Sequence, residues 1–366
     1  MRCRKIRIYP TVNQKKMFNN WIGTSRYVYN RALHATKQGE KINFYELRNK
    51  YVTAKNNPNI NEWELDTPKD IRAGAINDMV KAFKTAMSNL KNNNIQHFNL
   101  QYRKKKKESS IVIPSSALKK KDNDIFIYKT YTKEKIKVSK DKSLENIEFN
   151  HDCRLKNDNG KWFLYIPIKV HLNKNIAEKE ICSLDPGTRK FHTIYSEETV
   201  IKINLRKEKI EKLQMKIDKL QSLRSKKIIK QSHYNKSINK IHFRLKNLID
   251  EIHYQTISYL TNTFKTIFIP EFESQEILKI NKAKKFRRNL MGLRHFTFKE
   301  RLISKSKLKK GCIVNVCTEE YTSKTCGRCG TIVDVGRNEI FNCNVCFLNI
   351  DRDVNGARNI LIKQLV

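Results

Sequence analysis

The sequence predicts a multidomain α+β protein that begins with helices, continues with antiparallel strands and ends on a small cysteine-rich module. Apolar residues recur at helical spacing over residues 11–95 and alternate as in strands from about 98 to 170. Helical spacing returns over residues 204–260, which contain neither glycine nor proline. With 366 residues and 39% hydrophobic residues, the chain is long enough for two or three cores.

The charge of the chain indicates a polyanionic partner. It has 75 Lys and Arg residues against 36 Asp and Glu residues, a formal net charge of +39. Each contact between a cation and a phosphate releases condensed counterions, so affinity for nucleic acid accumulates over many contacts. No apolar run approaches the roughly 20 residues that span a bilayer, and the amino terminus lacks the apolar region of a signal peptide. We therefore expect an intracellular protein that binds nucleic acid and no membrane.

The amino-terminal part predicts one alternating strand and two helices. A capping-box pattern at Thr11 and Gln14 predicts the start of a helix that ends near Gly39. Residues 67–68 predict the N-cap and first position of a second helix, and residues 56–68 predict a loop between the two.

The middle of the chain predicts antiparallel strands. The alternating runs are residues 111–113, 125–128, 135–138 and 162–168. Basic runs at 104–107 and 119–121 lie between them. Such runs are typical of solvated turns, and in a chain this basic they are equally candidates for contacts with nucleic acid.

A second sheet is predicted to begin at residues 181–187, Ile-Cys-Ser-Leu-Asp-Pro-Gly, an apolar strand that ends in a carboxylate and a turn. Its next strands are predicted at 191–195 and 200–203. Residues 204–260 then predict a long helical hairpin with its break between 225 and 235. Taken alone, Asp185 is better explained as a turn residue, because Asp-Pro-Gly is a common turn.

Four cysteines near the carboxyl terminus predict a zinc ribbon. Cys326 with Cys329 and Cys343 with Cys346 form two Cys-x2-Cys knuckles, so four thiolates can converge on one zinc ion. Four thiolates leave no open coordination position, which predicts a structural zinc and places catalysis elsewhere. Two disulfides or four unrelated cysteines are the alternatives, and an intracellular setting disfavours the disulfides.

The other cysteines and the scattered histidines show no metal-binding spacing. We expect reduced cysteines in small core positions and histidines with structural roles. The cysteines are Cys3, Cys153, Cys182, Cys312 and Cys317, and the histidines are His34, His97, His192 and His295.

Two aspartates precede the last apolar segment of the chain. Asp353 lies in the first turn of a short predicted helix. An acidic residue at this position also suits the helix dipole or an N-cap without any chemistry. For Asp351 the N-cap is the preferred interpretation.

The carboxy-terminal segment resembles the signature of TnpB proteins and their eukaryotic and viral relatives, the Fanzors. It reads Tyr-Thr-Ser-Lys-Thr-Cys-x2-Cys-Gly, then a second Cys-x2-Cys, then Asp-Arg-Asp-Val-Asn-Gly-Ala-Arg-Asn-Ile-Leu. That family comprises transposon-associated, RNA-guided DNA endonucleases with a RuvC-type site, related to type V CRISPR effectors. The resemblance implies that Asp353 is the last catalytic aspartate and, with the ribbon downstream, that Asp185 is catalytic as well.

The resemblance leaves the catalytic glutamate open. Prokaryotic members carry it at the end of the strand that here covers residues 266–269, where the matching position is Pro270. Glu271 comes one residue late, and a slip of one residue turns a side chain to the opposite face of a strand. Fanzors resemble this chain in having proline there, and they supply the glutamate from just before the ribbon, which here is Glu319. We favour Glu319 over Glu271, with Glu320 a weaker third.

The resemblance also implies a domain layout. A wedge β-barrel is interrupted by a helical recognition domain, and a ribonuclease-H-like (RuvC) α/β nuclease domain is interrupted by a zinc ribbon that binds target nucleic acid. The ranges are 1–10 and 96–175 for the barrel, 11–95 for the recognition domain, 176–321 and 350–366 for the nuclease domain, and 322–349 for the ribbon. Without the resemblance, the first half supports only helices followed by strands.

The chemistry implied is that of an Mg²⁺-dependent endodeoxyribonuclease. Carboxylates 4 Å apart repel by about 4 kcal/mol per pair at an effective dielectric constant near 20. Two Mg²⁺ ions held by Asp185, Glu319 and Asp353 would offset this repulsion and activate water for in-line displacement. No helix-turn-helix or finger module is visible, so a guide RNA paired with double-stranded target DNA is expected to provide sequence choice. Residues 13–33 are the expected reader of a short motif beside the target.

The expected particle is a monomeric ribonucleoprotein, in the nucleus if its source is eukaryotic or viral and otherwise in the cytoplasm or nucleoid. Two other functions stay open. One is a ribonuclease-H-like transposase or resolvase that works without a guide. The other is a zinc-ribbon nucleic-acid-binding regulator with an inactive nuclease site, which the displaced glutamate favours and the intact Asp185 and Asp353 disfavour.

Overall fold

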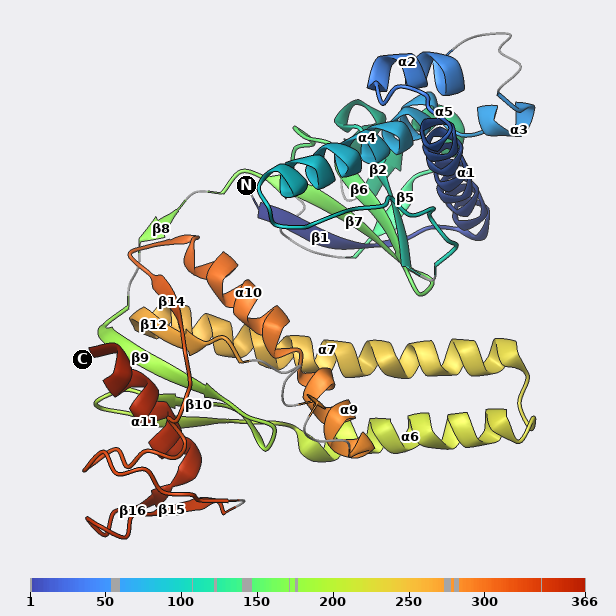
Figure 1. Ribbon diagram of the computed structural model, residues 1–366. Coiled ribbons are helices and arrows are strands. Elements are labelled where there is room, and N and C mark those ends of the chain that lie inside the picture. Colours follow the sequence, from blue (N-terminus) through green and yellow to red (C-terminus); the bar gives the residue numbers. More distant parts are fainter. Residues whose placement is uncertain are drawn as a thin grey trace. The chain divides into compact units, whose positions relative to one another are not determined.

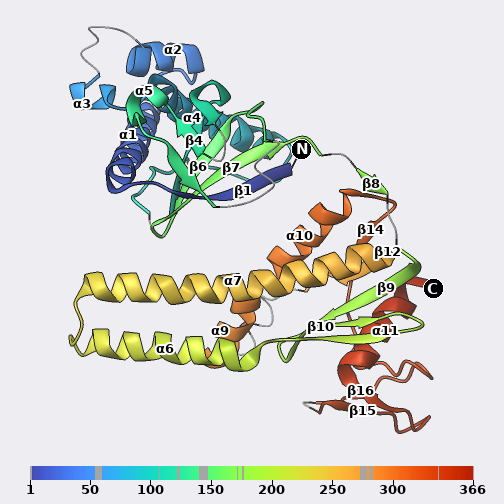
Figure 2. The ribbon, with the colours of Figure 1, turned by 180° about the vertical axis from the view of Figure 1, so that it is seen from behind.

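The protein divides into two compact units, Met1–Val170 and His171–Val366 (Figures 1 and 2). The computed structural model describes residues 2–53, 60–106, 108–121, 124–139, 147–170, 172–174, 177–272, 278–279, 283–336 and 338–365. Both units mix helices and strands, which confirms the predicted α+β class. Across these described ranges, no helix is both long enough and apolar enough to cross a bilayer.

The first unit is built on a seven-stranded antiparallel sheet with the order β2-β6-β7-β1-β5-β4-β3. Its strands are β1 (Arg2–Tyr9), β2 (Glu108–Ile113), β3 (Leu118–Lys121), β4 (Asp124–Ile127), β5 (Ile136–Val138), β6 (Cys153–Asp158) and β7 (Lys161–Ile168). Its helices are α1 (Val12–Lys37), α2 (Phe44–Arg48), α3 (Glu62–Leu65), α4 (Lys69–Lys91) and α5 (Lys129–Thr132), with short helical turns at Asn49–Thr53 and Ser115–Ala117. Closure of this sheet into a wedge barrel stays a prediction, because β2 and β3 are the two ends of the strand order.

The core of the first unit lies between this sheet and α1. Alternation along β1 turns Ile6 and Ile8 inward, where they meet Phe18 and Trp21 of α1. The indole N–H of Trp21 donates to the carbonyl of Asp66 at 3.2 Å, so the buried ring keeps a polar partner.

The predicted capping box at the start of α1 is confirmed. The amide of Gln14 donates to the hydroxyl of Thr11 at 3.3 Å, and the amide of Thr11 donates to Oε1 of Gln14 at 2.9 Å. The second predicted helix, α4, begins at Lys69 with Pro68 as its N-cap, one residue later than expected. The hydroxyl of Thr67, the expected cap, donates to the Thr24 hydroxyl at 2.9 Å instead.

Three local features of the first unit differ from the sequence-based expectation. The predicted loop over residues 56–68 contains α3, and its first residues, 56–59, lie outside the described part of the chain. The basic run at 119–121 is part of strand β3 and no turn, and β6 had no predicted counterpart. Strand β3 is an edge strand, where lysines are common and hide the usual alternation.

The second unit contains a five-stranded sheet with the order β11-β10-β9-β12-β14. Its strands are β9 (Lys179–Pro186), β10 (Lys190–Tyr195), β11 (Val200–Asn204), β12 (Phe264–Pro270) and β14 (Ile313–Cys317). Its helices are α6 (Lys207–Ser225), α7 (Gln231–Thr263), α9 (Lys284–Leu293), α10 (His295–Ser306) and α11 (Arg352–Leu365). Two-stranded ladders join β8 (Asn173–Lys174) to β13 (Lys309–Lys310), and β15 (Ile340–Asn342) to β16 (Asn349–Asp351).

Helices cover both faces of this sheet (Figure 1). Strands β9, β10 and β11 form an antiparallel meander, whereas β12 is parallel to β9 and β14 is parallel to β12. Parallel pairing needs crossover connections, and α6 with α7 supplies the first. Leu260 of α7 and Phe298 of α10 pack with Cys182 on one face, while Ile360 of α11 packs with Phe268 on the other.

The long hairpin predicted over 204–260 is confirmed as α6 and α7, with its turn at residues 226–230 inside the predicted break. Helix α7 passes into β12 without an intervening loop (Figure 2). Periodicity alone could locate this hairpin because two long helices without glycine or proline leave a strong local signal.

The predictions for the isolated cysteines and histidines are confirmed in part: His192 and His295 are buried core residues, whereas His34 and His97 are exposed. Cys153, Cys182, Cys312 and Cys317 are buried, but Cys3 is exposed, because it lies on the face of β1 opposite to the buried isoleucines. The histidines are less isolated than expected. The buried rings of His192, His253 and His295 surround Phe191, with His253 and His295 stacked on it at 5.0 and 5.1 Å between ring centroids. Burial lowers the pKa of His253 and of His295 to about 4, so both rings are neutral core groups.

Candidate active site and zinc ribbon

Asp185 is the next-to-last residue of β9 and lies on the face of the sheet that α11 covers. Two residues earlier, the hydroxyl of Ser183 donates to the carbonyl of Ala357 in α11 at 2.6 Å. Residues two apart on a strand share a face, so Asp185 also points toward α11. A Cβ atom placed on Gly356 would lie 2.9 Å from Oδ2 of Asp185. Only glycine lets the helix backbone and the carboxylate approach this closely.

Asp353 occupies the first turn of α11, as predicted. Oδ1 of Asp351 accepts hydrogen bonds from the amides of Asp353 and Val354, both at 3.1 Å, which confirms Asp351 as the cap of the helix. Oδ2 of Asp351 pairs with Nζ of Lys202 in β11 at 2.5 Å. These bonds therefore fix the first turn of α11, which contains Asp353, to the sheet.

The structure brings Asp185, Asp353 and Glu319 into electrostatic contact. Burial raises the pKa of Asp185 well above its ordinary value, and the negative charges of Asp353 and then Glu319 raise that pKa further. Burial and the charge of Asp351 also raise the pKa of Asp353. Negative charge on Asp353 disfavours ionisation of Asp185. Such a group of carboxylates gains by binding cations.

The strand register separates the two candidate glutamates. Phe268 of β12 lies opposite Ser183 of β9, so Pro270, two residues on, is level with Asp185 on the same face. Glu271 follows on the other face and is exposed. Its amide donates to the carbonyl of Cys317 at 3.0 Å.

Glu319 leaves the neighbouring strand on the favourable side. Cys317, the last residue of β14, is the partner of Pro270 and packs on the α11 face. Glu319 is two residues further and partly buried, whereas Glu320 is exposed. The carbonyl of Glu319 accepts the amide and the hydroxyl of Thr322, which fixes the backbone there. Of the three candidates, Glu319 has the position that best matches a partner for Asp185.

The four predicted cysteines converge in the ribbon. Their sulfur atoms all lie within 4.8 Å of one another, with Cys326 to Cys346 at 3.5 Å and Cys329 to Cys343 at 3.6 Å. A tetrahedral zinc with bonds of about 2.3 Å puts its sulfur ligands about 3.8 Å apart, so this donor set fits zinc. No other group of three or more such ligands converges in the described part of the chain. Among the described residues, the oxygen atoms of Asp185, Glu319 and Asp353 do not converge within 4.8 Å.

Two asparagines of α11 hold the ribbon against the carboxylate site. Nδ2 of Asn355 and Nδ2 of Asn359 donate to the carbonyl of Thr325 at 2.8 and 2.6 Å, and Nδ2 of Asn359 also reaches the carbonyl of Thr322 at 2.8 Å. Oδ1 of Asn355 accepts the amide of Gly327 at 3.1 Å. A Cβ on Gly327 would lie 2.9 Å from Oδ1 of Asn359, so this knuckle also requires glycine. The sequence analysis did not predict these roles of Asn355 and Asn359, although residues four apart share one helix face.

A basic hollow of about 580 Å³ lies in the first unit. Five of its lining residues are cationic: Arg26, Arg103, Lys104, Lys106 and Arg154. Part of the predicted basic run at 104–107 therefore lines a concave surface, while Lys107 lies outside the described residues. A concave surface with this charge suits phosphate groups.

The chain is similar to several known proteins. Residues 295–360 match the family model of the Cas12f1-like TNB domain, and residues 1–41 match a helix-turn-helix domain. The chain is 30% identical over 388 residues to TnpB-like protein L79 of Acanthamoeba polyphaga mimivirus, covering 98% of this chain and 72% of that protein. It is 22% identical over 387 residues to the putative RNA-guided DNA endonuclease InsQ of Escherichia coli K12, covering 98% and 90%. A cryo-EM structure of a Cas12f1–sgRNA–target DNA complex aligns with a TM-score of 0.54 at 16% identity, covering 96% and 83%.

The α+β fold with its cysteine ribbon is therefore that of the Cas12f-like proteins. The chain belongs to the TnpB family, as the resemblance of its carboxy-terminal motif implied. The helix-turn-helix match was not expected from the sequence. Over residues 2–41 the described structure has strand β1 and the single continuous helix α1.

The ribbon generates the first prediction. Cys326→Ser or Cys343→Ser removes one thiolate, so zinc should be lost and the carboxy-terminal part should open, because binding of a structural metal is coupled to folding. Zinc is measured by mass spectrometry of the metal content, and opening by hydrogen exchange at β15 and β16. Stoichiometric zinc in both variants would refute a four-cysteine site.

The contact between Gly356 and Asp185 generates the second prediction. Gly356→Ala should destabilise the protein by about 1–3 kcal/mol, because the added methyl group is forced against a carboxylate. Gly292→Ala is the matched control, since an added Cβ there meets nothing within 4 Å and alanine favours a helix by about 1 kcal/mol. Denaturant midpoints compare the two variants. Equal or higher stability of Gly356→Ala would contradict the close approach.

Proposed function

We propose that this protein is an RNA-guided DNA endonuclease with a ribonuclease-H-like (RuvC) site formed by Asp185, Glu319 and Asp353. The observation that carries the proposal is geometric: Asp185 of β9 lies against Gly356 of α11, three residues after Asp353, and Cys317, two residues before Glu319, packs on the same face of the sheet. The negative charges of Asp353 and Glu319 also raise the pKa of Asp185. The sheet order β11-β10-β9-β12-β14 supports it, because an antiparallel meander extended by two parallel strands is the arrangement expected of a ribonuclease-H-like sheet.

The residues suit hydrolysis of a phosphodiester bond. Asp185, Glu319 and Asp353 offer the oxygen ligands that Mg²⁺ prefers. Two bound Mg²⁺ ions would lower the pKa of an attacking water and stabilise charge on the leaving oxygen. The protein fixes the geometry: Asp351 and Lys202 hold the first turn of α11, and Gly356 allows Asp185 to lie against that helix. No nucleophilic side chain is required for this chemistry.

The partners we propose are a guide RNA and double-stranded target DNA. The net charge of +39 and the basic hollow of the first unit support binding of two nucleic-acid strands. Two similar proteins support the same partners: InsQ is named a putative RNA-guided DNA endonuclease, and the Cas12f1 complex contains sgRNA and target DNA. We further propose the wedge and recognition roles for the first unit, target binding for the ribbon, and a monomeric ribonucleoprotein. It would work in the nucleus if its source is eukaryotic or viral, and otherwise in the cytoplasm or nucleoid.

A Fanzor-like arrangement of the site is part of the proposal. Pro270 occupies the place level with Asp185, and Glu319 approaches from the end of β14 instead. A guide-independent transposase is the competing function. Removal of co-purified RNA separates the two, because only a guided enzyme loses sequence-specific cleavage when its RNA is removed.

The third prediction concerns the glutamate. Glu319→Gln should lower Mg²⁺-dependent cleavage at least about a hundredfold, as Asp185→Asn and Asp353→Asn should, because a ligand charge is lost while the shape is kept. Glu271→Gln is the matched control and should retain substantial activity, since Glu271 is exposed on the other face of β12. Cleavage of guide-matched DNA and binding of RNA are measured in parallel. An active Glu319→Gln beside an inert Glu271→Gln would overturn the rearranged site.

The fourth prediction concerns salt. Binding of RNA should weaken about a thousandfold or more between about 50 and 200 mM salt, the loss expected for roughly six to ten phosphate contacts. The charge of +39 provides enough cations for that number. The slope of log affinity against log salt is measured by filter binding. A slope that corresponds to only one or two contacts would contradict extensive binding of nucleic acid by this protein.

A further inference from the structure

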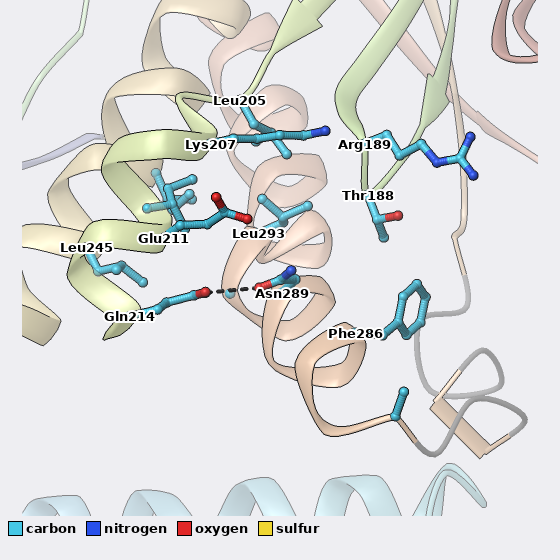
Figure 3. A pocket seen from close by; sticks show the side chains of 14 residues that line it. Thr188, Arg189, Leu205, Lys207, Glu211, Gln214, Leu245, Phe286, Asn289 and Leu293 are labelled. Carbon is cyan, nitrogen blue, oxygen red and sulfur yellow. Dashed lines mark hydrogen bonds between the residues drawn. The ribbon is translucent and has the colours of Figure 1, made fainter. Parts of the chain in front are cut away.

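A second hollow, of about 670 Å³, lies within the second unit between α6, α7, α9 and the turn that follows β9 (Figure 3). Its apolar lining comes from all three helices and the segment before α6, and includes Leu205, Ile210, Leu245, Ile249 and Leu293. Two amide side chains meet inside it, where Nε2 of Gln214 donates to Oδ1 of Asn289 at 3.0 Å. The hollow therefore combines apolar walls with a pair of amides that can bond to a polar edge.

The rim of this hollow carries one aromatic ring and several cations. Figure 3 shows Phe286 of α9 beside Thr188 on one side, with Glu211 and Gln214 on the other. Arg189 and Lys207 are exposed at the rim. Glu211 brings one negative charge, but Nζ of Lys285 lies 4.0 Å from its carboxylate. Phe286 itself stands in the run Lys-Lys-Phe-Arg-Arg, a basic segment with an aromatic residue inside it.

The rim and the carboxylate site are neighbours. Thr188 follows Asp185 by three residues, so their Cα atoms are at most about 10 Å apart. Arg189, the next residue, reaches the ribbon, where its Nη1 pairs with Oε1 of Glu339 at 2.7 Å. Phosphates along one strand of a duplex are spaced about 3.4 Å along the axis, so the hollow lies within a few nucleotides of the site.

We propose that this hollow receives an unpaired base of the DNA strand whose phosphate lies at the carboxylates. Phe286 stacks on the base, Gln214 and Asn289 face its polar edge, and Arg189 with Lys207 contacts the adjoining phosphates. A base inside a duplex is already stacked and paired, so only a single-stranded segment can enter. The apolar walls alone would also suit a peptide, but the cations of the rim match a strand of phosphates. This inference rests on the proposed function and specifies which form of the substrate the site accepts.

The first test uses the full-length protein, without added magnesium, and two fluorescent oligonucleotides of about a dozen units, the length that single-strand sites of this kind cover. One is oligodeoxythymidylate, and the other has the same phosphates but abasic sugars. Wild-type protein should bind the oligonucleotide with bases about tenfold more tightly, as expected for one stacked base. Phe286→Ala should reduce this ratio to near one. Phe296→Ala is the matched control, because Phe296 is 69% exposed and does not line the hollow.

The second test locates the base directly. Oligonucleotides that carry a 4-thiothymidine are photo-crosslinked to the protein, and the adduct is mapped by mass spectrometry. Adducts on α9 or on residues 188–189 support the proposal, and adducts only elsewhere overturn it. An unchanged ratio in Phe286→Ala, or an equal loss in Phe296→Ala, also overturns it.

Cleavage assays on the wild type keep this inference separate from the proposed function. If guide-matched DNA is cleaved while Phe286→Ala keeps the preference for bases, the hollow is refuted and the nuclease stands. If no cleavage occurs while Phe286→Ala loses that preference, the hollow stands and the proposed function fails.

Discussion

The approach of Asp185 to the backbone of α11 at Gly356 is the contact on which the second unit depends. It fixes the distance between the last helix and strand β9, the central strand of the sheet. A side chain at Gly356 would push the helix away and would separate Asp185 from Asp353. The bond from Ser183 of β9 to the carbonyl of Ala357, and the pairing of Lys202 of β11 with Asp351, hold the same helix to the sheet. One short helix thereby carries Asp353 and packs against Asp185.

This arrangement costs stability, and the cost has a definite sign. The pKa of Asp185 in the folded protein is raised above its unfolded value near 3.8. The folded state therefore binds this proton more tightly, so the contribution of Asp185 to stability is greatest below about pH 3.8 and is lost as the pH rises toward the raised pKa. At higher pH the ionisation of Asp185 opposes folding. A cation that binds only the folded protein offsets this cost, which is the usual balance between stability and a charged functional site.

The same helix also connects the carboxylate site to the cysteine ribbon. Asp353 lies in its first turn, whereas Asn355 and Asn359 hold the turn that leads into the first cysteine knuckle. Loss of zinc would therefore loosen the turn just after Glu319 as well as the ribbon. The small and polar residues of this motif therefore have specific neighbours: Gly356 adjoins Asp185, and Asn355 and Asn359 both bind the carbonyl of Thr325.

The sequence by itself determined the features that depend on local spacing. Four cysteines in two knuckles, a carboxylate at a strand end, and a hairpin free of glycine and proline are legible because neighbours in the chain create them. The tertiary structure decided the features that depend on strand register and on which face of a strand or helix a side chain occupies. Whether Glu319 or Glu271 adjoins Asp185 follows from the pairing of β9, β12 and β14, which lie far apart in the chain. Other features also arise only when separate segments pack together, because no local periodicity predicts which side chains will meet. They are the requirement for glycine at position 356, the exposure of Cys3, the three histidines around Phe191 and the hollow beside Phe286.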